Sequence, residues 1–61
     1  MTENGEFKLL TVTEVGNILN IGRASAYALV RQTGFPVIRI GRHFRVPEDA
    51  LYRWINSQVS D

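Results

Sequence analysis

The stretch from Gly22 to Gly34 reads Gly-Arg-Ala-Ser-Ala-Tyr-Ala-Leu-Val-Arg-Gln-Thr-Gly and lies at the centre of the chain. Glycine is tolerated at a helix N-cap, and a glycine just beyond a helix ends it by taking a positive φ. We therefore predict a helix between these two glycines. Phe35 should then pack back on Val30, and Pro36 should prevent continuation of the helix.

The two faces of this predicted helix differ in chemistry. At 100° per residue, the side suited to a core carries Ala26, Leu29, Val30 and Thr33. The opposite side carries Ala24, Tyr27, Ala28 and Arg31, with Arg23 and Ser25 at its edges. Small side chains allow close approach, and arginine offers a planar fork of donors to a phosphate or a guanine edge. This composition suits a helix lying in the major groove of DNA; the alternative is a solvent-exposed helix that happens to be rich in alanine.

Length and composition limit the class of protein. The 61 residues suffice for one small domain of marginal stability, with an ordinary apolar share of 44%. The absence of cysteine excludes disulfides and thiolate metal sites. No apolar run follows Met1, so we expect no signal peptide, no membrane span and a cytoplasmic location.

The net charge of +1 conceals a polarised arrangement. No acidic residue lies between Val15 and Pro47, and this interval has a local charge of +5 from its arginines, which are Arg23, Arg31, Arg39, Arg42 and Arg45. A basic centre flanked by acidic ends indicates a polyanionic partner. The alternative is a solvated basic face without a partner.

A strong helix start precedes the central stretch. Thr11 as N-cap, with Glu14 three residues later, forms a capping box, and Leu10 with Val15 forms the matching hydrophobic staple. We expect Asn20 to end this helix in the left-handed conformation.

Only three residues, Asn20-Ile21-Gly22, separate the two predicted helices. A connection this short predicts a helix-turn-helix unit, whose second helix is the one that reads DNA. We expect Ile21 to fill the space between the helices.

After Pro36 the apolar pattern changes to period two, which predicts strands at 37–40 and 44–46. A loop at 41–42 would pair Ile40 with His43 and mix apolar with basic groups. A loop at 41–43 would pair Ile40 with Phe44 and separate the two kinds of side chain, so we predict the three-residue loop.

The preferred register sets Arg39 opposite Arg45, and like charges facing each other across a hairpin repel. A phosphate backbone lying between the two arginines would offset that cost. We therefore interpret the hairpin as a wing with a basic tip.

A third helix is predicted to begin at Pro47, with Glu48 and Asp49 in its first turn, where carboxylates suit the helix dipole. Its apolar face consists of Ala50, Leu51, Trp54 and Ile55. The expected fold is therefore α+β and mostly helical, a winged helix-turn-helix with a two-stranded wing and a C-terminal helix. We assign 1–9 to a flexible arm, 10–57 to the DNA-binding domain and 58–61 to a frayed tail.

This order of elements resembles the excisionase family of small winged helix-turn-helix domains, which are related to the DNA-binding heads of MerR-type regulators. The resemblance runs from about Leu10 to Ile55, and its carriers are 10–15, 23–27, 34–36, 39–47 and 50–55. In that family the second helix enters the major groove, and the wing reaches the minor groove or the backbone. Gly22, Ala24 and Ala28 depart from the residues common there, and the last two remove hydrogen-bonding groups from the reading face.

The resemblance implies two groups of DNA-binding residues. The recognition helix would use Arg23, Ala24, Ser25, Tyr27, Ala28 and Arg31. The wing would use Arg39, Gly41, Arg42, His43 and Arg45.

The resemblance also implies a function, that of a recombination directionality factor. Such a protein binds and bends double-stranded DNA at the attachment site of a mobile element and so favours excision by an integrase. The implied partners are DNA, a tyrosine or serine integrase and neighbouring copies of the chain, in the nucleoid of a bacterium or on phage DNA. The alternatives are a small transcriptional regulator and, from the helix at 48–58, a protein-docking module.

The sequence lacks the side chains that an enzyme active site would need. His43 is the only histidine and has no partner ligands for a metal, and no glycine-rich phosphate loop is present. Tyr27 lacks the supporting basic residues of a recombinase active site. We expect no catalytic residue, metal, cofactor or small-molecule ligand.

Overall fold

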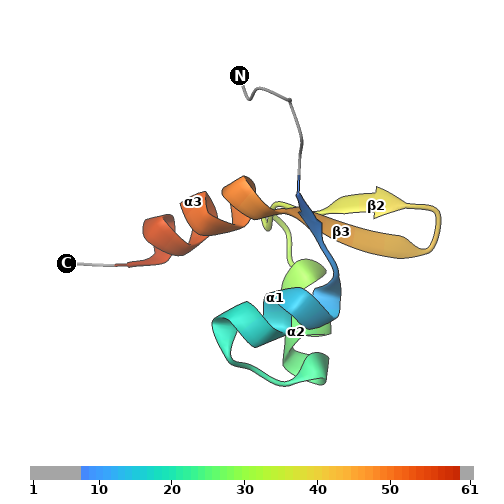
Figure 1. The fold of residues 1–61 in the computed structure, drawn as a ribbon, viewed down its shortest axis with the longest axis horizontal. Coiled ribbons are helices and arrows are strands. Elements are labelled where there is room, and N and C mark those ends of the chain that lie inside the picture. Colours follow the sequence, from blue (N-terminus) through green and yellow to red (C-terminus); the bar gives the residue numbers. More distant parts are fainter. Residues whose placement is uncertain (1–7, 60–61) are drawn as a thin grey trace.

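The computed structural model describes residues 8–59, which form three helices and a three-stranded antiparallel sheet (Figure 1). The elements follow the order β1 (Leu9–Leu10), α1 (Val12–Leu19), α2 (Arg23–Val30), β2 (Ile38–Ile40), β3 (His43–Pro47) and α3 (Glu48–Gln58). The predicted α+β, mostly helical winged helix-turn-helix is confirmed. The parts of the predicted arm and tail at 1–7 and 60–61 lie outside the described residues.

Strand β1 has no counterpart among the predicted elements. It pairs antiparallel with β3, Leu9 opposite Pro47 and Leu10 opposite Val46. The Glu48 backbone N–H extends this contact by donating to the Lys8 carbonyl at 2.9 Å. Two leucines without a turn signal do not identify a strand in sequence, because the pairing is decided by the distant β3. Its consequence is that the start of α1 is held beside the base of the hairpin (Figure 1).

The predicted start and end of α1 are both confirmed. The Thr11 hydroxyl accepts from the Glu14 backbone N–H at 3.1 Å, and the Glu14 carboxylate accepts from the Thr11 N–H at 2.8 Å. Asn20 ends the helix in the left-handed conformation, with φ 59° and ψ 46°. Local side-chain chemistry determines both ends, which is why the sequence reveals them.

The contact between α1 and α2 depends on Gly16 and not on Ile21. Ile21 is 37% exposed and is not among the residues packed against the core, so the prediction that it fills the space between the helices is wrong. A Cβ on Gly16 would lie 3.2 Å from the Ile21 carbonyl oxygen and 3.3 Å from the Ala26 Cβ. The two helices approach so closely that no room remains for an intervening side chain.

Helix α2 is shorter than predicted, because it ends at Val30 and not just before Gly34. After Leu29 the backbone hydrogen bonding is no longer α-helical. The Gln32 N–H donates at 3.0 Å to the carbonyl of Leu29, three residues back, whereas in an α-helix it would donate to the carbonyl four residues back. Gly34 does take a positive φ of 92°, but it does so in the turn that follows. That turn returns Phe35 to the core.

The hairpin register also differs from the prediction. The loop contains only Gly41 and Arg42, so that Ile40 pairs with His43, Arg39 with Phe44 and Ile38 with Arg45. Gly41 supplies the positive φ, 58°, that the favoured two-residue turns need at their first position.

The physical reason for this error lies in β2, whose three residues are all exposed. A buried face fixes register strongly, but an exposed strand leaves the choice to the turn. Arg39 therefore faces the aromatic ring of Phe44 and not Arg45. The expected repulsion between the two arginines is replaced by an attractive pair.

The core lies where α1, α2 and α3 meet the inner side of the sheet. Its buried members are Leu10, Val12, Val15, Ala26, Val30, Phe35, Val46 and Leu51. Trp54 on α3 packs edge-on against Phe35, with ring centroids 4.9 Å apart, and so ties α3 to the turn after α2. Pro47 is the N-cap of α3 and pairs within the sheet, so α3 begins one residue later than predicted.

Candidate nucleic-acid interface

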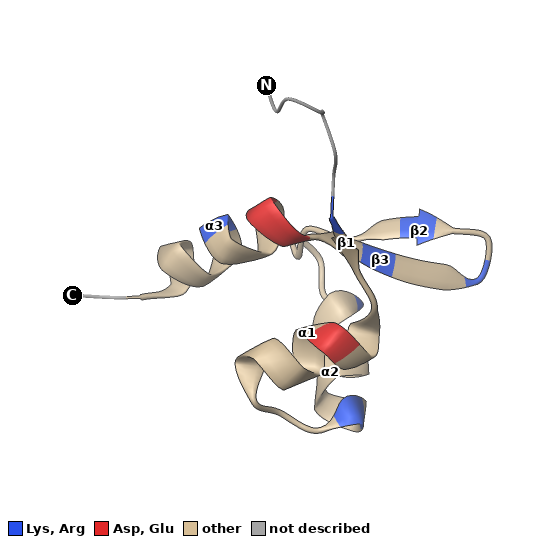
Figure 2. Ribbon diagram, viewed as in Figure 1, with Lys and Arg blue, Asp and Glu red and all other residues tan. Residues whose placement is uncertain are grey.

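Charge is segregated over the described part of the molecule (Figure 2). Most basic residues lie on α2 and the hairpin β2–β3, the others being Lys8 before β1 and Arg53 on α3, whereas acidic residues mark α1 and the start of α3. Arg53 forms the one arginine–carboxylate ion pair found within residues 8–59, with Asp49 at 3.3 Å on the same helix. Within residues 8–59, the arginines of α2 and of the hairpin therefore form no ion pair with a carboxylate.

The outward side of α2 presents all six residues that the sequence assigned to it. Ala26 and Val30 are buried on the core side, and Leu29 is half-buried. The exposed residues are Arg23, Ala24, Ser25, Tyr27, Ala28 and Arg31. Arg23 is the first residue of the helix, and Arg31 is its C-cap, so the surface has a cation at each end, with small side chains and Tyr27 between them.

Phe44 holds two of the arginines of the hairpin. The Arg39 guanidinium lies over the Phe44 ring, 5.3 Å from its centroid. The Arg45 Nη1 donates to the Phe44 carbonyl at 2.8 Å. Arg42 lies in the two-residue turn and is exposed. The hairpin therefore has two arginines held along its length and one at its tip.

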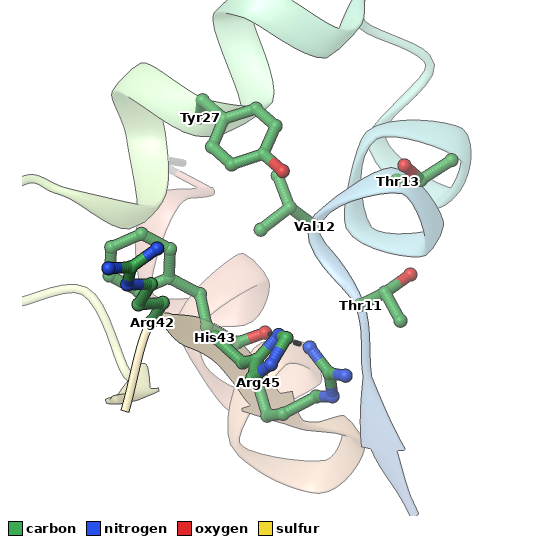
Figure 3. Close-up of a pocket in the computed structure, with 8 residues that line it drawn as sticks. Thr11, Val12, Thr13, Tyr27, Arg42, His43 and Arg45 are labelled. Carbon is green, nitrogen blue, oxygen red and sulfur yellow. Dashed lines mark hydrogen bonds between the residues drawn. The ribbon is translucent and has the colours of Figure 1, made fainter. Parts of the chain in front are cut away.

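A hollow of about 140 Å³ lies between α2, the hairpin and the start of α1 (Figure 3). It is lined by Thr11, Val12, Thr13, Tyr27, Arg42, His43, Phe44 and Arg45. The Tyr27 hydroxyl points toward the first turn of α1, while Arg42, His43 and Arg45 line the hairpin side. Its cationic and hydroxyl groups are of the kinds that contact phosphate oxygens.

The hollow brings together four of the predicted residues, Tyr27 from the recognition helix and Arg42, His43 and Arg45 from the wing. The other recognition-helix residues lie on the open surface of α2, and Arg39 and Gly41 lie elsewhere on the hairpin. Sequence reasoning missed Thr11, Val12, Thr13 and Phe44. It assigned Thr11 only a capping role, because the pairing of β1 with β3 that places it here is invisible in the sequence.

The described residues lack two further features. Between residues 8 and 59, no group of three or more His, Asp or Glu side chains is arranged to hold a metal ion. No helix in that part of the chain combines the length and apolar character needed to cross a membrane.

Comparisons with known proteins place the chain among helix-turn-helix proteins. Residues 9–59 match the family described as helix-turn-helix domain. An excisionase of Streptomyces ambofaciens is 39% identical over 54 residues, which cover 88% of this chain and 87% of that protein. Proteins from two strains of Mycobacterium tuberculosis, named as candidate DNA-binding proteins, are 30% identical over 59 residues, which cover 97% of this chain and 76% of theirs. No solved structure matches the chain.

Proposed function

Because the chain belongs to the family of small, excisionase-type helix-turn-helix DNA-binding proteins, we propose that it acts on double-stranded DNA as a recombination directionality factor. In this role α2 lies in the major groove and the hairpin contacts the adjoining backbone or minor groove. The observation that carries the proposal is the acid-free, arginine-bearing surface formed by α2 and the hairpin.

The finer part of the proposal concerns excision. The similarity to an excisionase over most of both chains supports a role at the attachment site of a mobile element, where the protein bends DNA and assists a tyrosine or serine integrase. Neighbouring copies would bind side by side on the same site. A protein with this role works in the cytoplasm, at the nucleoid or on phage DNA, and performs no chemistry itself.

DNA binding is tested by fluorescence anisotropy with a labelled duplex and the variants Arg23→Ala and Arg31→Ala. Each should weaken binding by about 1 kcal/mol or more, reaching about 3 kcal/mol if the guanidinium contacts a base edge. The control is Arg53→Ala, which removes a cation already paired with Asp49 on α3. Unchanged affinity in both test variants, or an equal loss in the control, would place the DNA contact elsewhere.

DNA bending is tested separately, by energy transfer between dyes at the two ends of a bound duplex. A directionality factor should shorten the end-to-end distance on its site and raise excision in a reconstituted integrase reaction. Tight binding without bending and without stimulation of excision would instead favour the transcriptional regulator.

A further inference from the structure

Helix α2 has an arginine at each end, Arg23 as its first residue and Arg31 as its C-cap. From Arg23 to Arg31 the helix axis advances about 12 Å at 1.5 Å per residue. A recognition helix lies along the major groove, and the phosphates of the two strands border that groove. Both arginines are exposed, and α2 itself contains no acidic residue. The two cations at the ends of α2 can therefore reach phosphates that border the groove, which leaves the residues between them to face the bases.

The side chains between these arginines contain few hydrogen-bonding groups. Ala24 and Ala28 are exposed on the outward side, interspersed with Ser25 and Tyr27. A methyl group that displaces water from a polar base edge leaves the donors and acceptors of that edge without partners, which is unfavourable. The thymine C5-methyl is the apolar group on the major-groove edges of the base pairs. Contact between it and an alanine methyl buries apolar surface on both sides.

Resting on the DNA binding proposed above, we propose that α2 selects thymine at the base pairs it covers, through contacts between the C5-methyl group and Ala24 and Ala28. Arg23 and Arg31 hold the flanking phosphates and contribute affinity that is the same for every sequence. The class of DNA site that fits this surface is therefore rich in A·T pairs, with thymine methyl groups facing α2.

The test compares the affinities of three alternating 16-base-pair duplexes, dA·dT, dA·dU and dI·dC, at one low salt concentration. The dA·dU duplex lacks only the C5-methyl groups. The dI·dC duplex keeps the minor-groove pattern of A·T but presents the major-groove edges of G·C. We expect dA·dT to bind most tightly. The affinity for dA·dU should be lower by about fourfold for each methyl group that α2 buries, as the transfer free energy of one methylene implies.

Two variants test whether the preference for dA·dT over dA·dU arises from α2. Ala24→Ser and Ala28→Ser keep the side chain small but add a hydroxyl group, and each should bring the affinity ratio of dA·dT to dA·dU closer to one. The matched control is Ala50→Ser, the same substitution on α3, which should leave the ratio unchanged. Circular dichroism spectra confirm that the variants are folded.

The possible outcomes distinguish a failure of thymine selection from a failure of the proposed DNA binding. Equal affinities for dA·dT and dA·dU would overturn thymine selection while leaving DNA binding intact. Tighter binding of dI·dC would also overturn it and would indicate that arginine reads the purine edge. If no duplex were bound at low salt, the proposed DNA binding itself would fail.

Discussion

Among single residues, Phe44 contacts two of the hairpin arginines, which its position in the sequence does not reveal. Its ring faces the Arg39 guanidinium, and its carbonyl accepts from Arg45. The resemblance to the excisionase family assigned both arginines to DNA contacts. The structure gives each of them a partner within the hairpin, which restrains the position of each guanidinium. Arg42 at the turn is the hairpin arginine best placed to meet DNA.

The pairing of Arg39 with Phe44 can be measured by a double-mutant cycle with Arg39→Gln and Phe44→Leu in urea unfolding. The expected coupling energy is about 0.5–1 kcal/mol, the range of an exposed cation–π pair. A second cycle that combines Phe44→Leu with Arg53→Gln serves as the control, because Arg53 lies on α3 and pairs with Asp49. Coupling in the first cycle no larger than in the control would contradict the assigned contact.

At the scale of elements, the features that the sequence predicts are those set by contacts between residues close to one another in the chain. The start and end of α1 could be predicted, because Thr11, Glu14 and Asn20 act on their own backbone neighbours. The end of α2 could not, because the return of Phe35 to Trp54 competes with the local glycine signal. The register of β2 was missed for a related reason, since patterning has little influence on a strand without a buried face.

The helix-turn-helix contact yields a prediction at this scale. Gly16→Val should lower the free energy of unfolding by about 1–3 kcal/mol, because its side chain would press on the Ile21 carbonyl and the Ala26 methyl. Asn17→Val places the same β-branched residue on an exposed position of α1 and controls for helix propensity. Equal effects of the two variants in urea unfolding would show that close approach at Gly16 does not matter.

At the scale of the whole molecule, the functional surface depends on contacts between distant segments. The sequence predicts which residues are basic and which helix presents them, because charge and periodicity are local patterns. It does not predict that β1 pairs with β3 and carries the first turn of α1 to the hairpin. The hollow lined by Thr11, Tyr27 and Arg42 is a product of that pairing.

The segregation of charge predicts a strong dependence of DNA binding on salt. Arg42→Ala should weaken binding about equally for all sequences and reduce the slope of log affinity against log salt by about one, because one phosphate contact is lost. Arg53→Ala, on α3, should leave the slope unchanged. The measurement is anisotropy over a series of salt concentrations, and an unaltered slope for Arg42→Ala would mean that the wing tip does not contact phosphate.

The central claim is that α2 and the hairpin together form one DNA-binding surface. The most direct test is a titration of the ¹⁵N-labelled protein with a short duplex, followed by NMR at low and at moderate salt. The account predicts that the amide shifts concentrate at 23–31 and 41–45 and diminish steeply as salt is raised. Shifts absent from these two segments, or centred on 52–58 of α3, would contradict it and indicate a protein-docking role.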